Sequence, residues 1–237
     1  MTRPSDAAAV SARPAGHAIV LADGEAPDRA SLDTSWPGWA DGVTLVVAAD
    51  GGARHADRLG LRIDRWVGDG DSIAAGALEA LRAAGVPVDL VPAAKDETDT
   101  ELALRAAIAA GATRITLIGA TGGARLDHAL ANVALLAHPA LGDRPAALLD
   151  ARSRVRLLRG PGTLDLAGRS GDLVSLIPFG GDAVGVRTEA LEYPLDGETL
   201  AVGVARGVSN VRRREGASVS VERGSILVVE TPATLST

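Results

Sequence analysis

The chain has 237 residues, 46% of them hydrophobic and 23% charged, and it carries a formal net charge of −6. This composition is typical of a globular protein with a substantial core and argues against intrinsic disorder. The chain contains no cysteine, which excludes disulfides, cysteine metal sites and thiol catalysis. With three Trp, one Tyr and one Phe, it also lacks the basic, aromatic surface of most nucleic-acid binders.

Residues 1–16 contain no continuous apolar run. No other apolar run approaches the roughly 20 residues needed to cross a bilayer. We therefore expect an irregular N-terminal extension rather than a secretory signal. Since nothing in the sequence argues for export, we expect a cytoplasmic protein.

The first two thirds of the chain alternate short β-rich runs with helical stretches. The expected strands are 17–22, 43–49, 65–68, 88–92, 114–120 and 146–150. Apolar residues at i, i+3 and i+4 predict helices in the intervening stretches. These stretches are 51–60, 74–85, 99–111 and 126–138. The alternation predicts an α/β fold with a mostly parallel sheet covered by helices on both faces.

The last third has a different pattern, because helical periods give way to β segments separated by glycines. These segments are 154–160, 172–180, 183–189, 218–224 and 225–230. The pattern predicts a small antiparallel sandwich or barrel. We therefore expect an α/β domain at residues 16–150 and an all-β domain at residues 151–237.

Four polar clusters follow the ends of predicted strands. They are Asp50–Gly52, Asp69–Ser72, Lys95–Glu101 and Thr121–His128. Ligands of open parallel sheets bind beyond the carboxyl ends of the strands, so the clusters predict a binding site at this edge. Each cluster taken alone also has a structural interpretation as a strand-to-helix turn, a solvated acidic turn or a helix N-cap at Thr98 or Asp99.

The sequence "GDGDS" places Asp69 and Asp71 one residue apart in a glycine turn. Two like charges at this spacing repel each other unless the turn is well solvated or a cation lies between them. Alternate carboxylates can share one Mg²⁺, which prefers one or two carboxylates together with phosphate oxygens and water. Both interpretations remain open on the sequence of this turn alone.

The other clusters supply groups that suit phosphate chemistry. Lys95 offers a positive charge to a phosphate, and Arg125 and Asp127 stand at the start of a predicted helix. His128 and Asn132 share a face of that helix, although a lone His on a helix is more often structural. The chain has no P-loop, no G-x-G-x-x-G fingerprint and no G-x-S-x-G elbow. The pattern favours Mg²⁺-dependent phosphoryl or pyrophosphoryl transfer.

The segments "ADGG", "GDGDS", "KDETDTELAL" and "GATGGARLDHALAN", in this order and spacing, resemble the thiamine pyrophosphokinase family. The later segments "LEYPLDGETL", "GVSN" and "GSILVVE" are similar to the thiamine-binding β-domain of that family. The resemblance covers about residues 17–230. It implies an α/β catalytic domain, a β-sandwich and a homodimer with active sites at the subunit interface. The implied reaction converts ATP and thiamine into AMP and thiamine diphosphate with Mg²⁺ as cofactor.

The resemblance also implies roles for residues that match the family pattern. The implied metal ligands are Asp69, Asp71 and Asp99, and the implied catalytic carboxylates are Asp50, Asp71, Asp99 and Asp127. Nucleotide binding falls to Gly51, Gly52, Ser72, Lys95, Asp96, Thr98, Arg125 and His128. Thiamine binding falls to Tyr193, Ser209 and Asn210.

The sequence departs from the family pattern at Ala124, which separates the glycines from Arg125 in "GGARLDH". The three arginines Arg212–Arg214 follow the expected thiamine site and suggest only surface charge or an interface. Two other functions remain as alternatives. One is a non-catalytic relative that binds a nucleotide, and the other is a kinase acting on another small alcohol.

Overall fold

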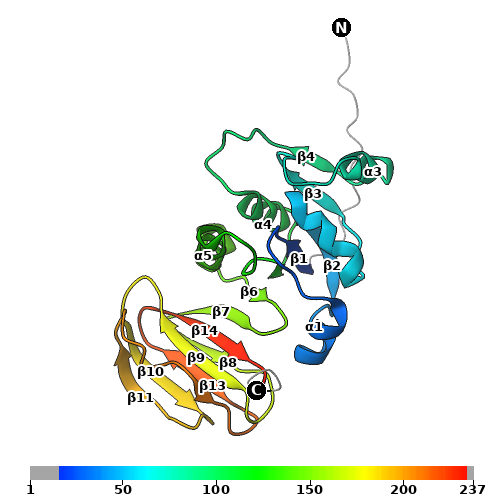
Figure 1. Ribbon diagram of the computed structural model, residues 1–237. Coiled ribbons are helices and arrows are strands. Elements are labelled where there is room, and N and C mark those ends of the chain that lie inside the picture. Colours follow the sequence, from blue (N-terminus) through cyan, green and yellow to red (C-terminus); the bar gives the residue numbers. More distant parts are fainter. Residues whose placement is uncertain (1–15, 234–237) are drawn as a thin grey trace.

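The computed structural model describes residues 16–233; residues 1–15 and 234–237, and with them the expected N-terminal extension, lie outside the described part. Ten of the described strands form one sheet. They are β1 (His17–Leu21), β2 (Val43–Ala49), β3 (Arg65–Gly68), β4 (Val88–Leu90), β5 (Arg114–Ile118), β6 (Ala146–Leu149), β7 (Arg154–Arg159), β9 (Leu173–Pro178), β12 (Asn210–Val211) and β14 (Ser225–Thr231). Their order across the sheet is β12-β9-β14-β7-β6-β5-β1-β2-β3-β4 (Figure 1).

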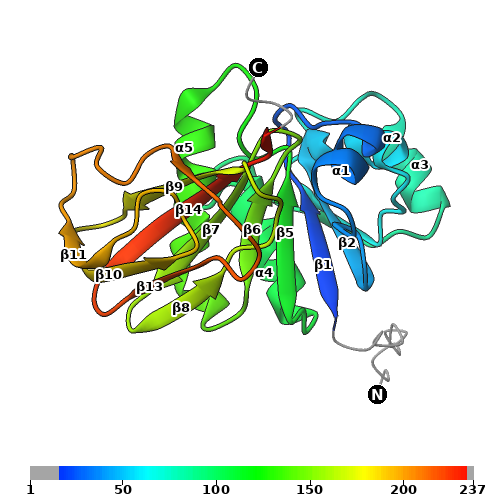
Figure 2. The ribbon, with the colours of Figure 1, turned by 90° about the horizontal axis from the view of Figure 1, so that it is seen from below.

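Six of these strands, from β6 to β4 in the sheet order, are parallel, and helices cover both of their faces. The helices are α1 (Arg29–Ser35), α2 (Ala56–Leu59), α3 (Ala77–Ala83), α4 (Asp99–Ala109) and α5 (Leu126–Ala134), with 3₁₀ turns η1 (Asp50–His55), η2 (Leu135–Ala137) and η3 (Pro139–Leu141). Figure 2 shows α1 and α2 at the surface beside β1 and β2. The predicted α/β fold with a mostly parallel sheet is confirmed.

The two faces of β1 pack into different cores because successive side chains of a strand point to opposite sides. Ile19 and Leu21 join Leu32 of α1 in one core. Ala18 and Val20 join the core that contains Leu104 of α4. All of these side chains are fully buried, so β1 is central to the α/β part.

The last third of the chain forms the predicted sandwich. Its second sheet contains β8 (Gly162–Asp165), β10 (Ala183–Glu189), β11 (Asp196–Leu200) and β13 (Ser218–Val221), in the order β11-β10-β13-β8. This sheet packs on the antiparallel end of the main sheet (Figure 1). The core between the sheets includes Leu176 and Val228 from one side and Val186 and Val219 from the other.

The main sheet runs through both of the expected domains. Residues 150–153 form the turn between β6 and β7, where Leu149 pairs with Arg154 and the sheet changes from parallel to antiparallel. Beyond this turn, β7 pairs with β14, and β14 with β9. The α/β part and the sandwich are therefore joined through backbone hydrogen bonds as well as through the chain. None of the helices in residues 16–233 is long and apolar enough to span a membrane.

Candidate active site

A pocket of 610 Å³ opens at the carboxyl edge of the parallel strands. Residues from all four predicted polar clusters line it, as the sequence predicts. From these clusters the lining includes Asp50, Asp69, Asp71, Ser72, Lys95, Thr98, Asp99, Arg125 and His128, and Asn132 lines it from further along the same helix. Carboxylates outnumber the cationic side chains in this lining, so the pocket suits a cation or a ligand that arrives with one.

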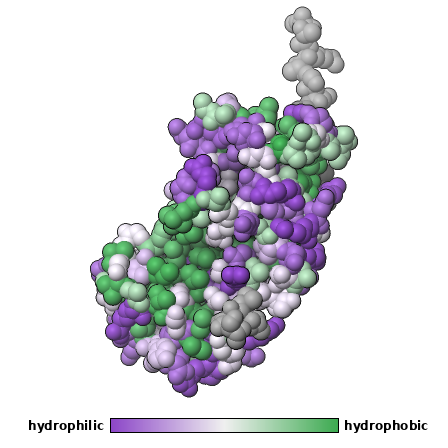
Figure 3. Space-filling view, in the orientation of Figure 1, coloured by the Kyte–Doolittle hydropathy of each residue, from purple (hydrophilic) through white to green (hydrophobic). Residues whose placement is uncertain are grey.

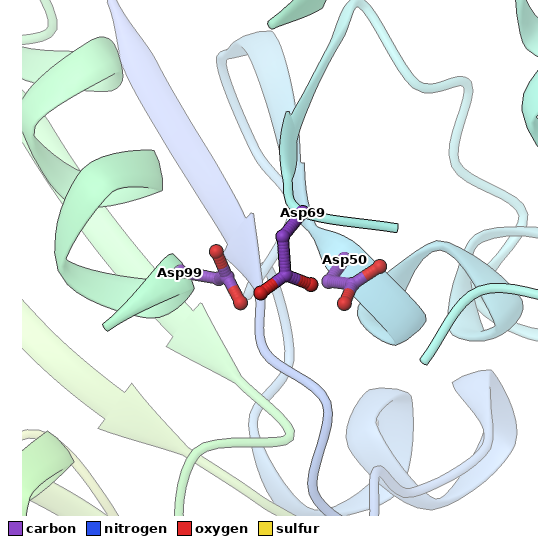
Figure 4. Close-up of side chains that lie close together, drawn as sticks. All are labelled: Asp50, Asp69 and Asp99. Atoms are coloured by element: carbon purple, nitrogen blue, oxygen red, sulfur yellow. The ribbon is translucent and has the colours of Figure 1, made fainter. Parts of the chain in front are cut away.

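Three carboxylates come together inside this pocket. Each of Asp50, Asp69 and Asp99 offers one oxygen, and these oxygens lie within 4.8 Å of one another. Figure 4 shows the three side chains lying close together, from the end of β2, the end of β3 and the start of α4. The tertiary fold therefore assembles a compact acidic cluster from segments that are far apart in the sequence.

Asp50 is the buried member of the cluster, with 2% of its surface exposed. Its φ angle is +43°, which is uncommon for a non-glycine residue and places a strained backbone at the pocket. Trp66 holds this backbone, because its indole Nε1 donates to the carbonyl of Asp50 at 3.0 Å. A Cβ at Gly68 would lie 2.8 Å from the Cβ of Asp50, so only glycine allows this close approach.

The environment of Asp50 disfavours its charged form. Burial raises the pKa of Asp50 to about 6, and the nearby carboxylates of Asp71, Asp99 and Asp69 act in the same direction. The amide of Ser72 donates to Asp50 Oδ2 at 3.2 Å and opposes this effect in part. The other oxygen, Oδ1, is buried and accepts no hydrogen bond from the described residues.

Asp69 has the opposite tendency. A hydrogen bond from the backbone amide of Asp71, at 3.2 Å, lowers the pKa of Asp69, and Lys95 lowers it further. The Nζ of Lys95 lies 3.4 Å from Asp69 Oδ2 and 3.0 Å from Asp99 Oδ1. Burial acts to lower the pKa of Lys95, but these two carboxylates outweigh it and raise the pKa. Lys95 is therefore charged and neutralises part of the cluster.

The cluster fits a divalent cation. Hard cations such as Mg²⁺ take oxygen ligands, and all the ligand atoms offered here are carboxylate oxygens. Asp50 Oδ1 is a buried acceptor with no donor among the described residues, and Lys95 pairs with Asp69 and Asp99 but with no oxygen of Asp50 among the described contacts. Both features indicate that the cluster lacks positive charge, which a bound cation would supply.

Asp71, the other half of the "GDGDS" pair, is exposed and lies at the edge of this cluster. The hydroxyl of Ser72 donates to Asp71 Oδ1 at 2.8 Å. Asp71 lines the pocket without joining the three converging carboxylates, whose third member is Asp50. The implied role of Asp71 as a metal ligand therefore stays a prediction, while Asp50 is the carboxylate that lies with Asp69 and Asp99.

The start of α4 positions Lys95 and Asp99. Thr98 is the N-cap of the helix, and its hydroxyl accepts a hydrogen bond from the amide of Glu101 at 3.1 Å. This is one of the two capping interpretations of the sequence. Capping fixes the first helical residue, Asp99, in the lining of the pocket. The structural and the functional interpretation of this segment are therefore compatible.

The start of α5 contributes Arg125 and His128 to the pocket. Asp127 is exposed and pairs with Arg125, with Nε to Oδ1 at 3.2 Å, and it is not part of the lining. This ion pair orients Arg125. Asn132 is buried and donates to the carbonyl of Ala120 at 2.8 Å, which holds α5 against the end of β5.

Three further predicted nucleotide residues lie beside the pocket without lining it: Gly51, Gly52 and Asp96. A Cβ at Gly52 would lie 2.2 Å from the carbonyl of Leu21, so this glycine allows η1 to pack against β1. The departure at Ala124 places an exposed residue in the pocket lining directly before Arg125.

The sequence interpretation missed Asp23 and Gly24, which follow β1 and line the pocket. Asp23 pairs with Arg54, whose guanidinium also donates to the carbonyl of Gly24 at 3.1 Å. These residues follow the end of a predicted strand, so the rule that identified the other four clusters would have found them. The polar residues at the carboxyl edge of the parallel strands therefore include those of the loop after β1.

The residues implied for thiamine binding lie elsewhere. Tyr193 and Asn210 line a separate pocket of 160 Å³ at the end of the sandwich, which shares no lining residue with the acidic pocket. Asn210 is buried, and its side chain accepts from the amide of Tyr193 at 3.0 Å and donates to the carbonyl of the same residue at 2.7 Å. Ser209 has φ +59° and does not line this pocket. The 65% exposure of Tyr193 leaves its ring available for contacts.

Comparison with known proteins gives matches to two family models. The model described as "Thiamin pyrophosphokinase, catalytic domain" matches residues 39–146, and the model described as "Thiamin pyrophosphokinase, vitamin B1 binding domain" matches residues 163–226. The chain belongs to the thiamine pyrophosphokinase family. The first match includes the four polar clusters, and the second includes Tyr193 and Asn210.

Individual family members agree with this assignment. The thiamine pyrophosphokinase of Bacillus subtilis is 27% identical over 193 residues, which cover 81% of this chain and 89% of that protein. A thiamin pyrophosphokinase structure from Geobacillus thermodenitrificans is 26% identical, with a TM-score of 0.73 and coverage of 91% of this chain and 97% of that one. The yeast thiamin pyrophosphokinase, at 15% identity, has the same fold with a TM-score of 0.72, covering 94% of this chain and 88% of that one.

Proposed function

We propose that the chain transfers pyrophosphate from ATP to the hydroxyl of thiamine, which gives thiamine diphosphate and AMP, with Mg²⁺ as cofactor. The observation that carries this proposal is the convergence of Asp50, Asp69 and Asp99 in a pocket at the carboxyl edge of the sheet. Membership of the thiamine pyrophosphokinase family supplies the substrate class. A reaction that consumes ATP is compatible with the expected cytoplasmic location.

In this reaction the thiamine hydroxyl attacks the β-phosphorus of ATP. A bond forms between that oxygen and the β-phosphorus, and the bond from the β-phosphorus to the oxygen bridging it to the α-phosphate breaks. AMP leaves with the bridging oxygen, and the hydroxyl proton passes to a carboxylate. A primary alcohol is a weak nucleophile, so alignment and charge stabilisation supply most of the catalysis.

The residues of the pocket divide these tasks. Asp50, Asp69 and Asp99 would hold Mg²⁺, which would neutralise phosphate charge when bound. Lys95 and Arg125 would contact the polyphosphate oxygens as cationic hydrogen-bond donors. Asp71 stands at the exposed edge, where a carboxylate free of the cluster can accept the hydroxyl proton.

We propose in addition that two copies of the chain complete each active site. The pocket of Tyr193 and Asn210 is separate from the acidic pocket within one chain, whereas the reaction requires thiamine and ATP to touch. Apolar side chains are exposed both on α5 and around the thiamine pocket. They are Leu126, Leu130, Tyr193, Val202, Val204 and Val208. Figure 3 shows apolar surface extending over the sandwich on the face that carries α5.

The proposed function is tested by incubating the purified protein with Mg²⁺, ATP and thiamine and separating the products by chromatography. We expect AMP and thiamine diphosphate in equal amounts, and neither when EDTA replaces Mg²⁺. The variant Asp69→Asn should lose activity by at least about 100-fold, since it removes a ligand at the point of charge development. Asp143→Asn, an exposed carboxylate away from the pocket, is the matched control.

Other products would contradict the proposal. ADP together with a monophosphate would identify a kinase of a small alcohol. An absence of turnover, with ATP or thiamine still raising Tm, would identify a binding protein that has kept the fold.

A further inference from the structure

A second cavity, of 490 Å³, lies where the α/β part meets the sandwich, and it shares no lining residue with the acidic pocket. It lies on the face of the main sheet that carries α1, over β5, β6 and β7. Trp36, at the end of α1, forms one wall, and its Nε1 donates to the carbonyl of Asp150 at 2.7 Å. Residues 167–170, which follow β8, form part of the opposite wall. The floor is hollow because Ala147 stands between Thr116 and Arg156 across the sheet.

The cavity has an excess of positive charge. Arg154 and Arg156 both pair with the single carboxylate of Glu230, at 2.8 Å in each case. Glu230 is 3% exposed, so this one buried carboxylate is shared by two guanidinium groups. Arg114 also lines the cavity, and its Nη2 donates to the carbonyl of Asp41 at 2.7 Å, which leaves its charge unpaired by any described carboxylate.

Two further arginines add to this excess. The guanidinium of Arg169, on the rim, makes no hydrogen bond or ion pair with the described residues. Arg212 is 5% exposed, and its Nη1 has no hydrogen-bond partner within residues 16–233. A Cβ at Gly168, which lines the cavity, would lie 3.2 Å from that Nη1 and 2.5 Å from Asp172 Oδ2, so the buried cation reaches the cavity wall beside the carboxylate of Asp172. Among the described residues of the lining, Asp172 is the one acidic side chain.

The aromatic side chains of the wall add a second kind of contact. Trp36 and Trp39 both line the cavity, and they are two of the three tryptophans of the chain. The guanidinium of Arg154 lies 5.0 Å from the centre of the Trp36 ring. A flat ring placed in this cavity would meet indole and guanidinium groups together, which are the groups that stack best on aromatic ligands.

We propose that this cavity binds a small phosphate ester that also carries a flat aromatic ring, such as a nucleoside monophosphate. Guanidinium groups match phosphate oxygens in geometry and charge, and the indoles match the base. The cavity has the volume of an ordinary small-molecule site. The chain has a net charge of −6, so a basic cavity is a distinct feature of its surface. An anion without a bound metal would be attracted to this cavity and repelled by the acidic pocket. The proposal does not depend on the reaction at the acidic pocket.

The test is calorimetric titration of the full-length protein with GMP, which is neither substrate nor product of the proposed reaction. EDTA in the buffer removes the metal that nucleotide binding at the acidic pocket would need. We expect saturable binding of one GMP per chain, with guanosine and inorganic phosphate each binding at least about tenfold more weakly. Arg169→Ala should weaken GMP binding about tenfold, and Ala147→Leu should abolish it by filling the floor.

The matched control is Arg223→Ala, which removes another exposed guanidinium that makes no ion pair with the described residues and changes the net charge equally. It should bind GMP as the unaltered protein does. Circular dichroism establishes that each variant is folded. Absence of saturable binding would overturn the proposal, as would equal affinity of Arg169→Ala and Arg223→Ala. Inorganic phosphate binding as tightly as GMP would also overturn it, because the site would then recognise an anion alone.

Discussion

Asp50 combines three unfavourable features at one residue: burial, a positive φ and neighbouring like charges. Each feature costs folding free energy, and none is needed for packing. Such costs gather at functional sites, where the arrangement serves a ligand rather than the fold. In this protein a bound cation would offset two of them, the buried charge and the repulsion between carboxylates.

We therefore predict that Asp50→Asn stabilises the metal-free protein while abolishing pyrophosphoryl transfer. Asn keeps the shape, removes the buried charge and tolerates the left-handed backbone region. The pKa of Asp50 is raised from 3.8 to about 6 in the folded state, so at pH 7 the group is ionised and its charge costs the folded state more free energy than the unfolded state. We expect a rise in Tm of about 2–6 °C, since each kcal/mol is worth roughly 2–4 °C at this size.

The measurement is a thermal melt in EDTA at pH 7, with Asp143→Asn as the control. The gain should shrink as the pH falls below about 6, because Asp50 is then protonated in the unaltered protein as well. A fall in Tm at pH 7 would show that the ionised carboxylate contributes to stability, which would contradict this account of the cluster.

His55 should make stability depend on pH. Burial lowers the pKa of His55, and the charge of Arg54 lowers it further. Its Nε2 lies 2.8 Å from the carbonyl of Gly24 and so carries the proton, while Nδ1 accepts from Arg58 at 3.3 Å. The folded state therefore requires neutral imidazole. The unfolded state takes up a proton near the ordinary pKa of 6.5, so this stability is present above about pH 6.5 and is lost as the pH falls.

We predict that His55→Gln, which stays neutral at every pH, loses less Tm than the unaltered protein between about pH 7.5 and 5.5. The exposed His128 supplies the control, and His128→Gln should follow the unaltered protein. Parallel curves for all three proteins would remove His55 as a source of the dependence.

Among the elements, those with a strong local signal could be predicted from the sequence. α4 has a cap at Thr98, a regular apolar face and a glycine after its end, and the structure begins it at Asp99 as expected. α1 could not be predicted, because Leu32 is its one buried residue and the rest of its segment is polar apart from Ala30. β12 has two residues, Asn210 and Val211, and is too short to carry any periodicity.

The candidate site shows the same limit. Strand ends predicted which segments meet, because the carboxyl edge of a parallel sheet is a property of the topology. Which carboxylate of a segment turns inward depends on backbone angles and on contacts such as that between Gly68 and Asp50, which no local pattern encodes. The resemblance implied a catalytic role for Asp50, and the structure adds that its carboxylate lies with those of Asp69 and Asp99. The implied role of Asp71 as a metal ligand stays a prediction, since Asp71 lines the same pocket.

The loops after β1 and β5 must approach closely to close the acidic pocket, and Gly24 permits this. A Cβ there would lie 2.3 Å from the carbonyl oxygen of Gly122 and 2.4 Å from that of Gly119. Because both obstacles are backbone atoms, Gly24→Ala must push the loops apart. We predict that kcat/KM falls by at least about tenfold, since small displacements near a reacting centre are costly.

The control for this variant is Gly111→Ala, at the end of α4. Gly111 has φ +86°, and no atom lies within 4 Å of the position that an added methyl group would take, so the substitution strains only the helix end. It should cost about 1 kcal/mol of stability and leave kcat/KM unchanged. Equal kinetic losses in both variants would mean that the effect of Gly24→Ala is a general loss of stability.

The sheet that joins the α/β part to the sandwich also holds two pockets at separate places in the molecule. The acidic pocket lies at the carboxyl edge of the parallel strands, and the pocket of Tyr193 lies at the end of the sandwich. Since the main sheet is continuous through β6 and β7, closing the gap within one chain would break its pairing. A second copy can bring the two pockets together without any such break.

This arrangement predicts that two inactive variants restore activity when mixed. Asp69→Asn damages the acidic pocket, and Tyr193→Ala removes an exposed ring from the pocket of Tyr193 and Asn210. If each site takes one pocket from each copy, a mixed dimer has one site with both defects and one site with none. Random reassociation of equal amounts should then give about a quarter of the unaltered activity, because half of the dimers are mixed and each holds one intact site.

The control mixes Asp69→Asn with Asp99→Asn, whose defects lie in the same pocket. A mixed dimer of these variants has a defect in both sites, so no activity should return. Native mass spectrometry would establish that mixed dimers form in each experiment. Mixed dimers of Asp69→Asn and Tyr193→Ala without activity would show that each chain builds its own site, and thiamine would then have to bind beside the acidic cluster of the same chain.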